Sequence, residues 1–358
     1  MPGSTFGTIF RIMTWGESHG KGVGVTIDGC PAGLQLCEED IQKYLDRRKP
    51  GQSQFTTARK EGDEVEILSG VFEGKTTGTP IAMVVWNKDQ RSKDYSSIMN
   101  VYRPGHADYT FDEKYGFRDY RGGGRSSARE TIARVAAGAV ACRILEQYGI
   151  TVTAYTKSIG EYEIDPLRFD LAQRDQNKLY MPDAKTAEEA GAYLETLIAQ
   201  QDSAGGVVEC VISGVPAGIG EPVFDKLDAR LAMAVMSIGA VKGFEVGDGF
   251  AAAKACGSSN NDVFRADDSG IIKKETNHSG GILGGISDGS EIIFRAAFKP
   301  TPSIAQEQKT VNRDRENVEI SIHGRHDPVV VPRAVVVVEA MAALTVLDLL
   351  LMNKNSKI

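Results

Sequence analysis

The sequence is poor in cysteine and histidine, and the few that it has are not spaced for metal binding or for a disulfide framework. Five cysteines are scattered over 358 residues without a CxxC pair, and none of the five histidines belongs to an HExxH pattern. Zinc sites and disulfide-rich folds need such spacings. We therefore expect reduced thiols and no metal site. The N-terminus also lacks the basic start and long apolar run of a signal peptide, which favours a cytoplasmic protein.

The sequence also has fewer basic than acidic side chains. The chain has 48 acidic and 41 basic side chains, a formal net charge of −7. This balance argues against nonspecific binding to nucleic acid or to an anionic membrane, because both attract basic surfaces. The most apolar stretch, 334–352, is long enough to cross a membrane but carries Glu339 and Asp348, which are costly in a bilayer. We expect it to be a buried core helix.

No Pro/Ser-rich linker, low-complexity run or long repeat interrupts the chain, so residues 1–358 are predicted to form a single large domain. The pattern mixes helices and strands without a steady βαβ alternation, which indicates an α+β fold. Helices are predicted at 127–148, 185–201 and 225–236, and strands at 6–13, 207–213 and 291–298.

The helix at 127–148 has the clearest boundaries. Ser127 and Glu130 form a capping-box pattern at its start, and Gly149 stands where a C-terminal cap belongs. Three polar, weakly periodic segments have the composition of mobile loops around a site, or equally of ordinary surface: 47–60, 87–105 and 305–318.

The stretch RGGGRSSARE, residues 121–130, is the most explicit signal for ligand binding. Three glycines lead into the start of the best predicted helix, where free N–H groups and the helix dipole favour an anion. Arg125 and Arg129 can add bidentate hydrogen bonds to phosphate or carboxylate. The GxxxxGK[ST] spacing of a P-loop is absent. The alternative is a glycine-rich turn before an ordinary capped helix.

Two histidines lie beside glycines on predicted turns, His19 in GESHG (16–20) and His106 in RPGHADY (103–109). An imidazole titrates near neutral pH, so it can donate a proton to a departing group or stabilise an anion. Each could instead be a hydrogen-bonded turn residue. Neither has the partners of a zinc ligand.

Three later stretches are weaker. NHSGGILGGISDG, residues 277–289, brings the backbone close either to a planar cofactor or to another chain segment. KPTPS, residues 299–303, offers a cation and hydroxyls on a stiff loop. HGRHDP, residues 323–328, holds Asp327 among basic residues, as a catalytic acid or as part of a solvated charged loop.

Taken together, GESHG, RPGHADYT, RGGGRSSARE, NHSGGILGGIS and GRHDP, in this order along nearly the whole chain, resemble the chorismate synthase family. The resemblance implies a carbon–oxygen lyase of aromatic amino acid biosynthesis. Its reaction is an anti 1,4-elimination that converts 5-enolpyruvylshikimate 3-phosphate to chorismate and phosphate with reduced FMN. The implied fold is a β-α-β sandwich with helices layered between antiparallel sheets, assembled as a homotetramer.

The resemblance also implies roles for individual residues. His19 would protonate the leaving phosphate, His106 would serve the reduced flavin near N1, and Asp327 would take a proton from flavin N5. Ser18 and Ser127 would relay protons. The implied FMN contacts are Arg125, Ser126, Ser127, Gly239, Ala240, Gly284, Lys299, Pro300, Thr301, Pro302, Ser303 and Arg325. The implied substrate contacts are Arg48, Gln54, Arg125 and Arg129.

The sequence departs from the family pattern at two places. Gln54 stands where bacterial relatives often have arginine, and Gly239 replaces a commonly larger residue. NADPH is a candidate reductant for FMN, although the short chain resembles the members that rely on an external one. The rival hypotheses are a nucleotide-dependent transferase, which would need a metal cluster that we do not find, and a noncatalytic anion-binding module.

Overall fold

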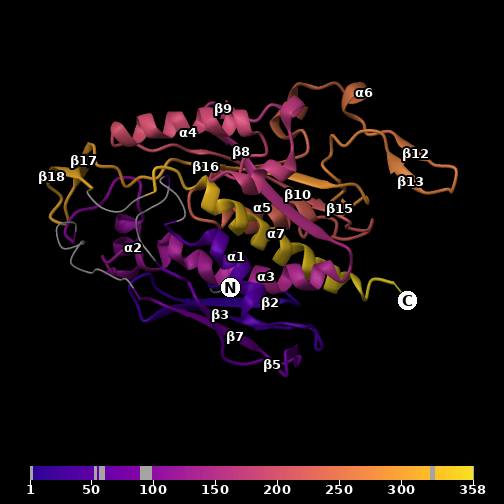
Figure 1. Ribbon diagram of the computed structural model, residues 1–358, viewed down its shortest axis with the longest axis horizontal. Coiled ribbons are helices and arrows are strands. Elements are labelled where there is room, and N and C mark those ends of the chain that lie inside the picture. The colour runs from indigo at the N-terminus through magenta and orange to yellow at the C-terminus, as the bar shows by residue number, and fades with distance from the viewer. Residues whose placement is uncertain (1–2, 52–54, 56–60, 89–98, 323–326, 358) are drawn as a thin grey trace.

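A computed structural model describes residues 3–51, 55, 61–88, 99–322 and 327–357 (Figure 1). Two five-stranded sheets enclose a layer of helices, and the buried apolar side chains of both sheets and of the helices form one contiguous core. This arrangement is the β-α-β sandwich that the sequence predicts.

The first sheet, at the bottom of Figure 1, has the strand order β1-β2-β3-β7-β4, with every neighbouring pair antiparallel. Side chains of β2 alternate between exposed and buried, as expected for a sheet with one face on the core. The strands are β1 (Thr5–Phe6), β2 (Arg11–Gly16), β3 (Gly22–Asp28), β4 (Val65–Ile67) and β7 (Ile81–Trp86).

The second sheet has the order β11-β16-β10-β8-β9 and is also antiparallel throughout. Its central strands confirm the predictions at 207–213 and 291–298 to within one residue at each end. The strands are β8 (Thr151–Ile159), β9 (Tyr162–Glu163), β10 (Gly206–Ser213), β11 (Val241–Val246) and β16 (Ile292–Phe298).

The helices between the sheets are α1 (Glu38–Arg48), α3 (Thr131–Glu146), α5 (Leu227–Met236) and α7 (Val331–Asn353). α3 packs on β2, β3 and β7 of the first sheet, whereas α7 packs on β8 and β10 of the second. The two helices touch closely, because a Cβ at Gly138 would overlap Ala340. Their contact therefore joins the two halves of the sandwich.

The buried helix predicted at 334–352 is confirmed as α7, although α7 is long and apolar enough to cross a membrane. Of its most apolar window, 89% is buried inside the fold. Glu339 accepts hydrogen bonds from Arg47 and from the Ala154 N–H. Asp348 accepts from the N–H groups of residues 8–10 and from Arg230. Both buried carboxylates are thus compensated.

The remaining elements lie around this core. They are α2 (Asp108–Tyr115), α4 (Ala184–Ala199), α6 (Gly257–Asn260), β5 (Val71–Phe72), β6 (Lys75–Thr76), β12 (Phe264–Ala266), β13 (Ile272–Lys274), β14 (Ile282–Leu283), β15 (Ile286–Ser287), β17 (Glu307–Val311) and β18 (Asn317–Ser321). Short 3-10 helices are η2 (Gly124–Ser126), η3 (Ala128–Glu130), η4 (Pro166–Arg168), η5 (Leu171–Gln176) and η6 (Gly249–Lys254).

Three local predictions are wrong. The strand predicted at 6–13 is broken after β1 by a turn at Gly7, whose φ is +94°. Of the two alternatives for 305–318, the mobile loop is wrong, because the segment contains β17 and begins β18. The helix predicted from Ser127 starts only at Thr131, because Ser127 is extended between η2 and η3 and caps η3 by accepting from the Arg129 N–H. Gly149 does follow the helix with a φ of +70°, as predicted.

Candidate active site

A cavity of about 640 Å³ opens where the starts of α3 and α7 meet the end of α5 and the loop after β16. Among the described residues, its wall carries eight lysine and arginine side chains and two carboxylates, Glu130 and Asp327. The eight are Arg48, Arg103, Arg125, Arg129, Arg134, Lys242, Lys299 and Arg333. Five of the eight are ion-paired with carboxylates in or behind the wall. The other three, Arg125, Lys242 and Lys299, form no ion pair with a described residue, and this local excess of positive charge favours an anionic ligand.

The glycine-rich turn forms part of this wall, and its backbone lies very close to the His19 side chain. Gly122, Gly123 and Gly124 have φ angles of +65°, +82° and +53°, which side-chain-bearing residues rarely adopt. A Cβ at Gly122 would overlap the His19 imidazole and lie 2.9 Å from Ser18 Oγ. The turn therefore lets the cavity wall pass directly over the histidine.

His19 and Ser18 lie behind that wall, 7% and 2% exposed. Ser18 Oγ is 3.1 Å from His19 Nδ1 and donates to the Gly122 carbonyl over 3.3 Å. The imidazole is thus held next to Gly122, which lines the cavity. The structure brings this stretch together with the glycine-rich turn more than a hundred residues away.

Arg48 and Arg129 line the cavity but are anchored by carboxylates behind it. Asp63, whose side chain is 0% exposed, accepts from Arg48 Nη2 at 2.7 Å and from Arg129 Nη1 at 2.9 Å. Glu61 pairs with Arg129 as well. Burial lowers the pKa of Arg48 to about 10, helped by the charges of Arg333 and Arg129 and opposed by Asp63. Arg48 therefore still carries its charge at neutral pH.

Arg125 is held differently, by oxygen atoms of the first sheet. Its guanidinium donates to Thr14 Oγ1 at 2.6 Å and to the carbonyls of Thr14 and Gly16 at 3.2 Å each. These partners are neutral, so they leave its charge uncompensated. Ser126 Oγ donates to the Gly123 carbonyl and closes the turn.

His106 also lines the cavity and is bonded to the predicted cofactor loop. Its Nε2 is 2.7 Å from Ser303 Oγ, and Lys299 Nζ donates to the Gly105 carbonyl over 2.8 Å. Burial, followed by the charge of Lys242, lowers the pKa of Lys299. Two segments nearly two hundred residues apart thus form one wall. Within the loop, Pro300 does not line the cavity.

Asp327 completes the cavity at the start of α7. It accepts from Arg333 Nη1 at 2.5 Å, and Arg333 Nε donates to the Arg48 carbonyl at 3.0 Å. Gly239 and Ala240 also line the cavity. Ala240 has a strained φ of +73°, whereas a Cβ at Gly239 would meet no atom within 4 Å. The structure thus leaves room for the larger residue that relatives carry there.

Of the predicted residues that the structure describes, four are not among those that line this cavity: Ser18, His19, Pro300 and Gly284. Gly284 lies in the turn between β14 and β15, outside the lining. Gln54 and Arg325 lie outside the described residues. Conversely, sequence reasoning missed Glu61 and Asp63, because a run of acidic residues has the composition of a solvated surface.

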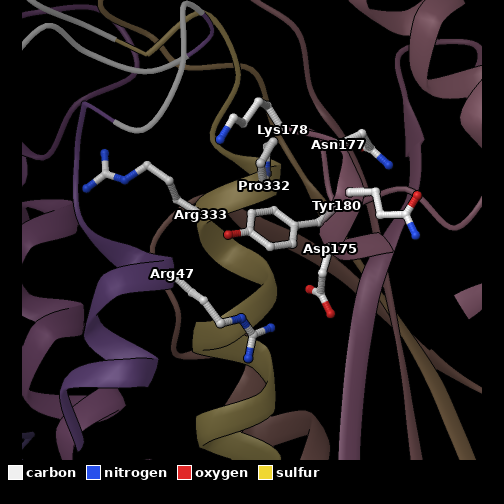
Figure 2. Close-up of a pocket in the computed structure, with 8 residues that line it drawn as sticks. Arg47, Asp175, Asn177, Lys178, Tyr180, Pro332 and Arg333 are labelled. Carbon is white, nitrogen blue, oxygen red and sulfur yellow. The ribbon is translucent and has the colours of Figure 1, made fainter. Parts of the chain in front are cut away.

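A second, small pocket of about 70 Å³ adjoins the first and shares Arg333 with it. Figure 2 shows the Tyr180 ring between Arg47 and Arg333, with its hydroxyl directed between them. Arg47 is bonded to Glu339, and the pocket has room for a few water molecules only. It supports the start of α7 rather than forming a substrate site.

Comparison with known proteins matches these features to one family. Residues 10–351 match the family model of chorismate synthase. The chain belongs to the chorismate synthase family. A chorismate synthase of Agathobacter rectalis is 66% identical over 100% of this chain and 97% of its own length, and one of Chloroflexus aurantiacus is 56% identical over 100% and 98%. A crystal structure of chorismate synthase, 33% identical, superimposes with a TM-score of 0.77 over 98% of this chain and 94% of the other.

The predicted family, fold and enzyme class are therefore confirmed. As a member of this family, the protein is a carbon–oxygen lyase of the shikimate pathway, and its reaction converts 5-enolpyruvylshikimate 3-phosphate to chorismate and phosphate. The family implies a flavin cofactor. A transferase and a noncatalytic binding module, the two rival hypotheses, are set aside by the same matches.

Proposed function

We propose that the large cavity is where the elimination takes place, with reduced FMN bound beside the substrate. The observation that carries this proposal is the excess of positive charge on the wall, where Arg125, Lys242 and Lys299 form no ion pair with a described residue. The substrate brings a phosphate and two carboxylates, and FMN brings a further phosphate, so such an excess offsets their charge. The volume of about 640 Å³ falls within the range usual for small-molecule sites.

The reaction needs two events at opposite ends of the substrate. The bond from carbon to the phosphate oxygen breaks and its electron pair leaves with the phosphate, while a proton is lost from C6. Reduced FMN, when bound, would supply an electron-rich ring able to accept that proton. Positive groups fixed in place before the reaction stabilise the charge that builds on the departing phosphate.

His19 is the proposed general acid for the phosphate. It lies under Gly122, whose missing side chain leaves the imidazole close to the cavity, and Ser18 Oγ fixes its Nδ1 side. This contact gives the ring a defined orientation, and an imidazole can give a proton near neutral pH. Ser18 is the proposed proton relay on the buried side.

His106 and Asp327 are the proposed partners of the flavin. Nε2 of His106 is bonded to Ser303 of the proposed cofactor loop, so the ring has a defined orientation. Asp327 is held by Arg333 at the cavity wall. An aspartate there can accept a proton, and Ser127, at the N-terminus of η3, is the proposed second relay.

The proposed cofactor contacts are those that the family pattern indicates. Within the cavity lining these are Arg125, Ser126, Ser127, Gly239, Ala240, Lys299, Thr301, Pro302 and Ser303. Pro300 stiffens the same loop, and Arg325 stays a proposed contact. Arg48, Gln54, Arg125 and Arg129 stay the proposed substrate contacts. Because Gly284 lies outside the cavity, its proposed contact requires the cofactor of a neighbouring subunit.

A homotetramer is the proposed assembly, and a cytoplasmic location the proposed site of action. Large apolar side chains near α5 are exposed in the single chain, among them Phe224 at 90% and Met233 at 52%. Such exposure in a stable protein marks contact surfaces. Sedimentation velocity tests the assembly: a single species of four chains supports it, and a monomer contradicts it.

The decisive test is an anaerobic assay of chorismate formation from 5-enolpyruvylshikimate 3-phosphate. We expect turnover with chemically reduced FMN, one phosphate released per chorismate, and no net consumption of the reduced flavin. Steady turnover with oxidised FMN and no reductant would falsify the proposal. Parallel reactions with oxidised FMN and NADPH show whether this enzyme reduces its own cofactor.

A further inference from the structure

The turn that carries Ser18 and His19 is held by a side chain from another strand. Asn87, immediately after β7, donates from Nδ2 to the Glu17 carbonyl at 3.0 Å and to the Gly20 carbonyl at 2.8 Å. Its backbone N–H donates to the Lys21 carbonyl at 3.0 Å. One amide thus binds both ends of the turn, with the histidine between them.

The oxygen of the same amide faces the cavity wall. Asn87 Oδ1 accepts from Arg129 Nε at 2.6 Å. Arg129 is fixed in turn by its ion pairs with Asp63 and Glu61. The position of the His19 turn is therefore tied, through one side chain, to an arginine that lines the cavity.

We propose that Asn87 is a positioning residue that aligns His19 with the phosphate-binding wall. The inference rests on the proposed role of His19. Asn87 is not among the cavity-lining residues, so it acts through the turn and not by touching substrate. The turn closes by itself through a Gly20 N–H bond to the Glu17 carbonyl, so what Asn87 adds is its placement relative to Arg129.

The Asn87 amide provides both a donor for the two turn carbonyls and an acceptor for Arg129. Two carbonyls require a donor, and the Arg129 guanidinium requires an acceptor. Asn87→Asp keeps the acceptor for Arg129 and replaces the donor with an oxygen that faces two carbonyl oxygens. This variant therefore releases the His19 turn while it preserves the contact with the wall.

We expect Asn87→Asp to lower kcat roughly tenfold to a hundredfold, because a displacement of about 1 Å at a reacting group has effects of that size. FMN affinity and KM should change less than threefold, roughly, since the Arg129 contact remains. A matched control is Asn177→Asp. Asn177 Nδ2 also donates to two backbone carbonyls, of Gln173 and Met181, but outside the large cavity. Its kcat should equal that of the wild type.

A double-mutant cycle separates positioning from general stabilisation. If Asn87 acts through His19, then Asn87→Asp should cost less than about threefold in a His19→Ala background. Two outcomes would overturn this inference but not the proposed role of His19. The first is that the two substitutions lower kcat independently, so that their fold-effects multiply in the double mutant. The second is that Asn87→Asp keeps a kcat near that of the wild type while His19→Ala is impaired. Full turnover by His19→Ala would overturn the proposed role of His19 and the inference with it.

Melting temperatures are measured for every variant, so that kcat is compared among folded proteins. If Asn87→Asp does not fold, Asn87→Ala, which brings no new charge, takes its place in the cycle. Asn87→Ala should also lower kcat less in the His19→Ala background than in the wild type. If it does not, the inference is overturned.

Discussion

Substitution of Gly122 by alanine should reduce turnover far more than it reduces stability. The new Cβ would overlap Cε1 and Nδ1 of His19, where ordinary contact begins only at 3.4 Å, so the ring must move by about 1 Å. It would also meet Ser18 Oγ at 2.9 Å, which blocks a simple rotation toward the serine. A shift of about 1 Å at a general acid lowers kcat by roughly a hundredfold.

The same substitution carries a backbone cost that must be separated from the clash. Gly122 has a φ of +65°, and a side chain there costs about 1–2 kcal/mol of stability. Gly116→Ala is the matched control: Gly116 has a φ of +77°, but a Cβ there meets nothing within 4 Å. Its stability should fall by a similar amount without loss of turnover.

The assay is the anaerobic conversion of 5-enolpyruvylshikimate 3-phosphate with reduced FMN, with urea unfolding for both variants. Gly122→Ala should bind FMN and lose turnover, whereas Gly116→Ala should keep it. Equal turnover of the two variants would refute the placement of His19 against the cavity wall. If both Gly122→Ala and Gly116→Ala lost turnover, the loss would come from strain in the backbone and not from the clash with His19.

Asp327→Asn keeps an oxygen for Arg333 but removes the base, so kcat should fall by roughly a hundredfold or more with little change in melting temperature; turnover within a few fold of wild type would return this aspartate to a structural role. Asp348→Ala should lower the unfolding free energy by about 3–5 kcal/mol, because it leaves the partners of a buried carboxylate without their acceptor. Asp268→Ala, at an exposed position between β12 and β13, should change it little in the same urea titration. Burial raises the pKa of Asp63, but Arg48 and Arg129 outweigh it and hold that pKa below its ordinary value of 3.8. Ionised Asp63 therefore stabilises the folded state above pH 3.8, and this stabilisation is lost as the pH falls through the folded pKa. The difference in unfolding free energy between the wild type and Asp63→Asn should become smaller in acid. A difference that does not change with pH would contradict this.

Local sequence patterns determined the elements whose formation depends mainly on nearby residues. α4, α5, α7 and the central strands β10 and β16 follow from periodicity and β-branched content, and their ends shift by only one to three residues. The same holds for the glycine-rich turn, because its φ angles need glycine wherever it lies in the fold. Five stretches in one order were enough to predict the family and the fold.

Tertiary structure decided which charges meet. Glu61 and Asp63 look like solvated surface in the sequence, yet they are buried counterions of Arg129 and Arg48, because the chain folds them behind the cavity wall. The α-helix also begins at Thr131 and not at Ser127, because Ser127 is extended and caps the short 3-10 turn η3 that precedes α3.

The partners of His19 were likewise beyond the reach of local patterns. Gly122 and Asn87 lie more than sixty residues away in sequence from the His19 turn. Gly122 comes next to the turn when α3 packs on the first sheet, and Asn87 when β7 pairs with β3. Sequence alone determined that a histidine and a glycine-rich turn are present. Their contact depends on long-range packing, which periodicity and spacing do not encode, and that packing places the proposed acid at the cavity.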